Sequence, residues 1–144
     1  MKILTNNKDI LIIRLDKGDN LIEKIKEVVS AEGIQGGFFN GIGACAKVVL
    51  SYFDIEKKEY LDRTFDEPLE IVSLSGNIAH ADGDVVVHAH GVFSNANYST
   101  VGGHVKELIV SVTCELALTK LRSPLNRDIN QEFGLKLLRE QTSK

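Results

Sequence analysis

Three of the four histidines of this chain, His88, His90 and His104, lie close together in its most hydrophobic part. Consecutive side chains of a strand point to opposite faces, so His88 and His90 would project side by side from a strand over 85–93. His104 follows a polar stretch that is long enough to turn and begin a neighbouring antiparallel strand. Neutral imidazole is the commonest metal ligand, and three protein ligands with one open position are typical of catalytic zinc. The sequence therefore predicts a zinc site on these three histidines.

A second interpretation of the same histidines is structural. The His-X-His pattern is common, and strand histidines often hydrogen-bond to the backbone or to each other. A buried polar group without a partner costs about 1–3 kcal/mol. Either a metal ion or a subunit interface would supply that partner.

Composition restricts the class of protein. The 144 residues predict a single domain over 1–144, with a core at about 5–120 and a C-terminal extension. The net charge of −3 argues against a free-standing nucleic-acid binder, because phosphate neutralisation supplies most of such a protein's affinity. The densest positive cluster contains Lys120, Arg122 and Arg127, and we interpret it as a solvated end.

The two cysteines and the hydropathy indicate the compartment. Cys45 and Cys114 lie far apart in predicted strands and form no CxxC motif, so we expect buried, reduced thiols. No apolar run has the length of a signal peptide or a membrane span. The expected location is the cytoplasm.

The predicted elements give an α+β fold, with a mainly antiparallel sheet of six to seven strands packed against a long helix. Asn20 and Glu23 have the spacing of a capping box, and an apolar stripe follows them, so the long helix is expected over 20–32. Apolar residues at Ile129, Phe133 and Leu137 predict a short C-terminal helix. The strands are expected at 9–16, 46–54, 60–65, 69–79, 85–93 and 104–118.

Two glycine-containing segments are interpreted as structural. The four glycines of 36–43 lack the dinucleotide and P-loop patterns, so they indicate a bulge or a close approach of two backbones. Asp82-Gly83 predicts a hairpin turn. His80 would then be an exposed turn residue, outside the metal site.

Four motifs follow the predicted helix in a fixed order: Gly41-Ile-Gly-Ala44, Leu69-Glu-Ile-Val-Ser-Leu-Ser-Gly-Asn-Ile78, His88-X-His90 and Gly102-Gly103-His104. Together they closely resemble the plants-and-prokaryotes conserved (PPC) domain, in its stand-alone prokaryotic form. The resemblance implies a homotrimer, and a metal, zinc, bound by the matching His88, His90 and His104. Many members of this family are named as DNA-binding proteins, and that name derives from plant relatives that carry an AT-hook. This chain has no Gly-Arg-Pro core of such a hook.

Three functions remain open at this stage. The first is a homotrimeric, metal-binding regulatory or assembly domain, and the second is a DNA-binding, transcription-associated protein. The third is a zinc-dependent enzyme of unknown substrate, with Glu107 as general base and Asn77 or Ser99 orienting the substrate. Neither the substrate nor a partner protein follows from the sequence, and nothing in it suggests a membrane partner.

Overall fold

The computed structural model describes residues 1–140, in which one helix and nine strands are found. The helix α1 spans Leu21–Ala31. The strands are β1 (Lys2–Asn6), β2 (Ile10–Asp16), β3 (Gly37–Asp54), β4 (Glu59–Phe65), β5 (Leu69–Ala81), β6 (Asp84–Ser94), β7 (Thr100–Lys120), β8 (Arg127–Ile129) and β9 (Lys136–Leu138). The predicted α+β class and antiparallel sheet are confirmed, whereas β1 was not expected.

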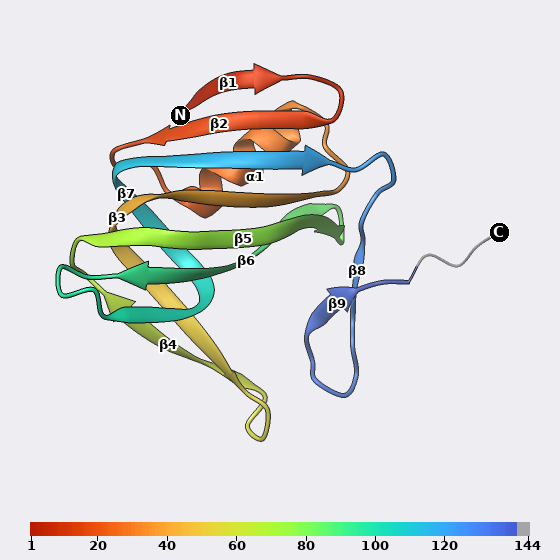
Figure 1. Cartoon of the computed structure of the whole chain (residues 1–144). Helices are drawn as coiled ribbons and strands as arrows, with labels where there is room; N and C mark the ends of the chain where they lie inside the picture. The colour runs from red at the N-terminus through yellow and green to blue at the C-terminus, as the bar shows by residue number, and fades with distance from the viewer. Residues whose placement is uncertain (141–144) are drawn as a thin grey trace.

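Strands β1 to β7 form one antiparallel sheet, which Figure 1 shows face on. The long strand β7 organises it. One edge of β7 pairs with β6 near its start and with β2 near its end, while the other edge pairs with β3. Because β3 also pairs with β5, and β5 with β6, the strands β3, β5, β6 and β7 close into a ring. This closure brings the histidine-bearing parts of β6 and β7 together.

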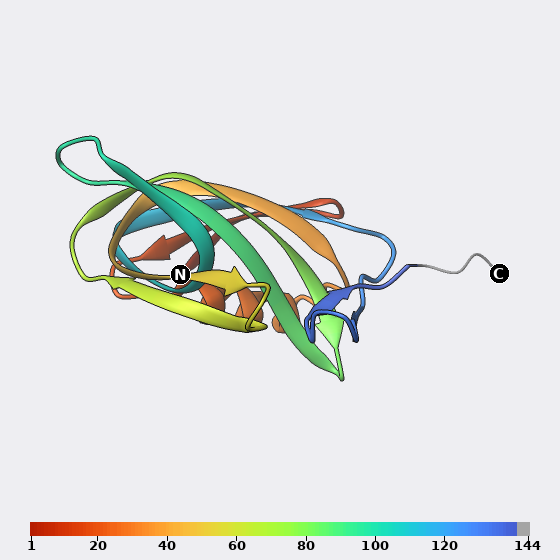
Figure 2. The ribbon, with the colours of Figure 1, turned by 90° about the horizontal axis from the view of Figure 1, so that it is seen from below.

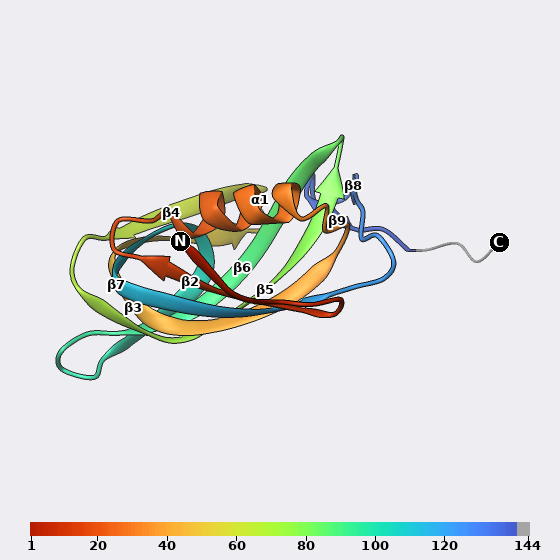
Figure 3. The same cartoon turned by 90° about the horizontal axis from the view of Figure 1, so that it is seen from above.

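Helix α1 covers one face of the curved sheet (Figure 3). The side chain of Asn20 caps its start, since Asn20 Oδ1 accepts from the backbone nitrogens of Ile22 and Glu23 at 3.0 and 3.3 Å. The helix has 11 residues, so it is short rather than long as predicted. It ends because Gly33 takes a left-handed conformation, with φ of 63°. No helix among residues 1–140 is long and apolar enough to cross a membrane.

The face of the sheet opposite α1 is rich in exposed apolar side chains. Phe38 is 49% exposed and Ile42 is 60% exposed, both on β3, and Val72 on β5 is similarly open. Val112 on β7 is 72% exposed, close to the point where the pairing of β3 with β7 shifts register. We call this surface the outer face.

The predicted C-terminal helix is wrong. Residues 127–138 instead form the hairpin of β8 and β9, which lies beside the ends of β5 and β6 (Figure 2). Asn130 Oδ1 accepts from the backbone nitrogens of Glu132 and Phe133 at 3.0 and 3.1 Å, which stabilises a turn. Gly134 then adopts φ of 70°, a conformation that a helix cannot contain.

Glycines allow β3 to pack closely on β7, as the sequence predicted for 36–43. A Cβ on Gly41 would lie 2.8 Å from the Glu115 carbonyl oxygen, and one on Gly43 would collide with the Thr113 carbonyl oxygen. The pairing of β3 with β5 also shifts register between Gly41 and Gly43. These glycines therefore allow the backbones of β3 and β7 to lie close together.

Candidate metal centre

His88, His90 and His104 converge as predicted. One ring nitrogen from each can be chosen so that all three lie within 4.8 Å of one another. The ring centroids are 5.1 Å apart for His88 and His90, 5.2 Å for His88 and His104, and 5.5 Å for His90 and His104. The cluster therefore has the size and shape of a site for one metal ion.

The strands β6 and β7 fix this geometry. His90 is the cross-strand partner of His104, and Gly91 is the partner of Gly103. His88 shares a face with His90 because residues two apart on β6 point the same way, while Ala89 between them is buried. A Cβ on Gly102 would lie 2.9 Å from the Gly91 carbonyl oxygen, so small residues permit the close approach of the two strands.

The electrostatic surroundings keep two of the histidines neutral. The pKa of His88 is lowered to about 4, mainly by burial and then by the nearby His104, Arg127 and His90. Burial, followed by the charge of His90, also lowers the pKa of His104, whereas Asp62 acts in the opposite direction. A metal ion binds the deprotonated imidazole, so these shifts favour the form that binds.

An unpartnered nitrogen atom in the histidine cluster also fits a metal ion at this position. Among the described residues, the buried Nδ1 atom of His104 has no hydrogen-bond partner. An unpartnered buried nitrogen is costly in an apolar pocket, and coordination or a proton acceptor would remove that cost. Three imidazoles suit zinc and also copper, iron or nickel, so the ligand type leaves the metal's identity open.

Arg127 adjoins the cluster, contrary to the expectation of a solvated end. Only 8% of its surface is exposed. Its Nη2 atom donates to Asn77 Oδ1 at 2.7 Å and lies 3.4 Å from His88 Nδ1. Its Nη1 atom donates to the Lys136 carbonyl oxygen at 2.8 Å. Sequence reasoning missed this residue, since its position depends on the docking of β8 against β5, which no local pattern reveals.

A second set of side chains surrounds His104. The ring of Tyr60, from β4, stacks on it with centroids 5.4 Å apart. Ser51, the cross-strand partner of His104, donates to Asp62 Oδ1 at 2.7 Å. Asp62 also pairs with Lys106. The carboxylate near the cluster is therefore already bound to a hydroxyl and an ammonium group.

The other residues predicted to act in the site lie elsewhere, with one exception. Glu107 forms an ion pair with Lys47 at 2.7 Å and does not belong to the histidine cluster. Ser99 lies in the turn before β7, where its nitrogen donates to Asn95 Oδ1. Asn77 is the exception, because it reaches the cluster through Arg127.

His80 does not belong to the histidine cluster, but its predicted surroundings were wrong. It belongs to β5 rather than to an exposed turn, and it is half-buried. Its Nε2 atom lies 3.1 Å from the Ile34 carbonyl oxygen. The turn itself is at Asp82 and Gly83, as predicted, with φ of 54° and 89°.

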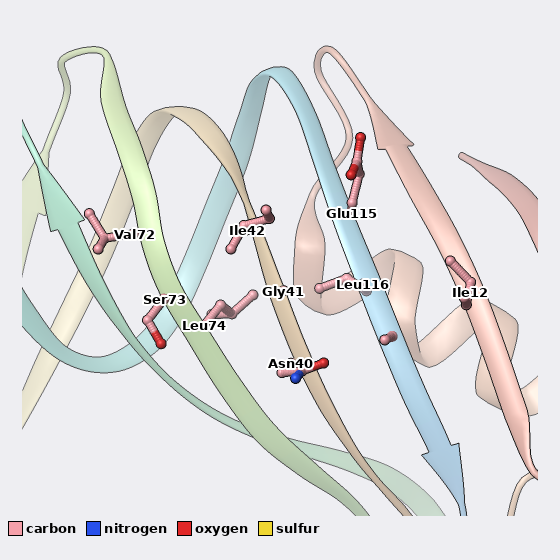
Figure 4. A pocket seen from close by; sticks show the side chains of 10 residues that line it. Ile12, Asn40, Gly41, Ile42, Val72, Ser73, Leu74, Glu115 and Leu116 are labelled. Carbon is pink, nitrogen blue, oxygen red and sulfur yellow. The ribbon is translucent and has the colours of Figure 1, made fainter.

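The outer face carries a depression on the same side of the sheet as the histidines. It lies over β2, β7, β3 and β5, with α1 on the far side (Figure 4). Its apolar walls include Ile12, Ile42, Val72 and Leu74. Cross-strand pairing connects this surface to the histidine cluster, since Asn77 pairs with both Phe38 and His88.

The model of the Plants and Prokaryotes Conserved domain matches residues 4–122. The chain belongs to this family. The match includes all three histidines but ends before Arg127. No curated protein matches the chain in sequence.

Solved structures share the fold over nearly the whole chain. A metal-containing protein from Archaeoglobus fulgidus is 33% identical, with a TM-score of 0.86, over 97% of this chain and 100% of that one. A plant- and prokaryote-conserved protein from Pyrococcus horikoshii is 30% identical, with the same TM-score and coverage. A protein from Bacteroides thetaiotaomicron, whose name describes it as a candidate DNA-binding protein, is 27% identical. Its TM-score is 0.90 over 94% of each chain.

Proposed function

We propose that this PPC-domain protein binds one zinc ion per chain through His88, His90 and His104. The convergence of the three imidazoles carries the proposal. The lowered pKa values of His88 and His104, and the unpartnered Nδ1 of His104, support it. The name of the similar archaeal protein, which describes it as metal-containing, agrees with it.

We further propose that the chain assembles as a homotrimer through its outer face and acts as a regulatory or assembly domain. The support is the group of exposed apolar side chains on that face, which includes Phe38, Ile42 and Val72. Contiguous exposed apolar surface marks interaction sites in soluble proteins. Because the histidines lie on the same side of the sheet, assembly would also enclose the metal centre.

Metal content of untagged, chelator-free protein tests the zinc site. Plasma mass spectrometry is expected to find about one zinc per chain in the wild type and none in the double variant His88→Ala/His90→Ala. His80→Ala is the matched control, because His80 lies outside the cluster, and it should retain the metal. Wild-type protein that takes up no zinc would contradict the proposal.

Sedimentation equilibrium tests the assembly. The wild type is expected to sediment as a trimer at micromolar concentration, and Ile42→Glu is expected to dissociate it, since a charge would be buried in an apolar contact. Ile55→Glu is the control, because Ile55 is similarly exposed but lies in the turn between β3 and β4. A monomeric wild type would refute the trimer.

A DNA-linked role is the second candidate, and the name of the Bacteroides relative favours it. The net charge of −3 opposes it, although assembly could gather scattered lysines and arginines into one patch. An electrophoretic mobility-shift assay with DNA at low salt tests this role, because low salt strengthens any electrostatic binding to DNA. Absence of a shift under that condition would dispose of this candidate.

Catalysis is a third candidate, which the open side of the histidine cluster and the adjoining Arg127 favour. Zinc, when bound, would supply Lewis acidity at an open position. Glu107 is not available as the general base, since it is paired with Lys47 away from the cluster. A hydrolysis panel compared between wild type and His88→Ala tests this role.

A further inference from the structure

Arg127 is a buried cation without an acidic partner. Its side chain forms no ion pair among the described residues, although it is only 8% exposed. Burial lowers the pKa of its guanidinium group. A buried charge is costly unless an opposite charge or a full set of hydrogen bonds compensates it.

The hydrogen bonds of Arg127 are incomplete. Its acceptors within 2.8 Å are two neutral oxygens, Asn77 Oδ1 and the Lys136 carbonyl oxygen. Its buried Nε atom has no partner among the described residues. The guanidinium group is therefore held in place by its neighbours but retains donor capacity and an uncompensated charge.

The contact between Arg127 and His88 changes when a metal binds. In the metal-free protein, His88 Nδ1 can accept from Arg127 Nη2, which lies 3.4 Å away. If His88 binds the metal through Nε2, its Nδ1 carries a hydrogen and can no longer accept. Two donors then face each other, and a shared acceptor would satisfy both.

Charge in this part of the molecule also favours an anion. A divalent ion on three neutral histidines adds two positive charges beside the one on Arg127. The nearby carboxylate is Asp62, and it is already bound to Lys106 and Ser51. The loaded site therefore has an excess of positive charge that the described side chains do not balance.

We propose that Arg127 and the Nδ1–H group of metal-bound His88 together form a two-point binding site for a small organic carboxylate, beside the metal. This inference rests on the proposed metal site and names the class of its ligand. A carboxylate fits better than phosphate, because one guanidinium group faces the site and the nearby Lys106 is occupied by Asp62. Tyr60, stacked on His104 and partly exposed, forms an apolar wall for the remainder of the ligand.

Isothermal titration of zinc-loaded, full-length protein with acetate tests the site. Acetamide is the uncharged match, and inorganic phosphate distinguishes a carboxylate site from a general oxyanion site. Wild-type protein is expected to bind acetate more tightly than either. Arg127→Gln should weaken acetate binding about 10- to 100-fold, the range for loss of a charged hydrogen bond. Arg139→Gln, in the same C-terminal extension but paired with Asp128, should bind as wild type does.

A second variant, which retains Arg127, tests the site without the risk that the hairpin of β8 and β9 is disrupted. Arg127 also holds β9 through the Lys136 carbonyl oxygen, so its replacement could loosen the hairpin. Asn77→Asp changes one atom and places a carboxylate against Arg127 Nη2. That internal anion should compete with acetate and weaken its binding at least 10-fold, while zinc content stays at the wild-type level.

The outcomes separate this inference from the metal site. Zinc-loaded wild type that binds acetate no better than acetamide or phosphate would overturn the inference and leave the metal site intact. Unchanged acetate affinity in zinc-loaded Asn77→Asp would do the same. Wild type without zinc would overturn both. In cobalt-substituted protein, a change of the visible spectrum with acetate that disappears in Asn77→Asp is the supporting spectroscopic result.

Discussion

Asn77 holds Arg127 beside the histidine cluster. The Oδ1 atom of Asn77 accepts from Arg127 Nη2 at 2.7 Å, while its backbone is the cross-strand partner of His88. One residue of β5 therefore connects β6, which carries His88 and His90, to the C-terminal hairpin. Two regions more than 30 residues apart in sequence, around His88 and Arg127, are positioned through it.

Replacing Asn77 by Ala should destabilise the fold. The change removes a neutral acceptor from a buried cation, and an unsatisfied buried group of this kind costs about 1–3 kcal/mol. Urea unfolding should show the loss as a lower midpoint with an unchanged slope. Asn97→Ala is the control, because Asn97 is exposed in the turn before β7. Equal midpoints for the two variants would contradict the role of Asn77.

The metal-free protein should lose stability as the pH falls from about 6.5 towards 4. The pKa of His88 is about 4 in the folded protein, against the ordinary histidine value of 6.5. Between these values the unfolded chain binds more protons than the folded one, so stability rises with pH. The contribution of His88 is complete above 6.5 and is lost as the pH approaches 4.

Urea unfolding at pH 7, 5.5 and 4.5 measures this dependence. The variant His88→Gln has no imidazole at this position, so the difference between wild type and variant isolates the contribution of His88 from that of other titrating groups. As the pH falls, the wild type should lose more free energy of unfolding than His88→Gln does. A difference that stays constant over the three pH values would show that His88 titrates normally.

The histidine cluster was predictable because its geometry is local. The alternation of β6 places His88 and His90 on one face, and the short turn to β7 brings His104 opposite His90. Arg127 gave no such signal. Its burial depends on the docking of β8 against β5, a contact between segments more than 40 residues apart.

The C-terminal helix was predicted wrongly because spacing alone is ambiguous. Ile129, Phe133 and Leu137 repeat at intervals of four, which is typical of one helical face. In the structure, the side chain of Asn130 stabilises a turn and Gly134 takes a positive φ, so the chain reverses. Both residues are turn formers, and they outweigh three apolar positions in so short a segment.

The two cysteines should not react with thiol reagents in the native protein. Cys45 and Cys114 are free and fully buried, and burial raises their pKa values to about 11 and about 12. The thiolate is the reactive species, so both access and ionisation are unfavourable. Ellman's reagent should detect no thiol at pH 8 and two per chain after unfolding in guanidinium chloride. Rapid labelling of the folded protein would contradict this burial.

Gly43→Ala should cost more stability than Gly18→Ala. Both glycines have positive φ, of 151° and 86°, so an added side chain is strained at either position. Around Gly18 the space is open, whereas at Gly43 the new Cβ would collide with the Thr113 carbonyl oxygen and the Cα of Cys114. Gly18→Ala should lose about 1–2 kcal/mol from backbone strain alone.

Gly43→Ala adds a steric clash to that strain, because β3 would have to move away from β7. Its total loss should exceed about 3 kcal/mol, which is more than most single substitutions cost. Since the ring of β3, β5, β6 and β7 holds the histidines together, the separation of β3 from β7 should also reduce zinc content. Urea unfolding and plasma mass spectrometry on the same samples measure both effects. Equal losses in the two variants would show that φ, rather than close approach, requires glycine at position 43.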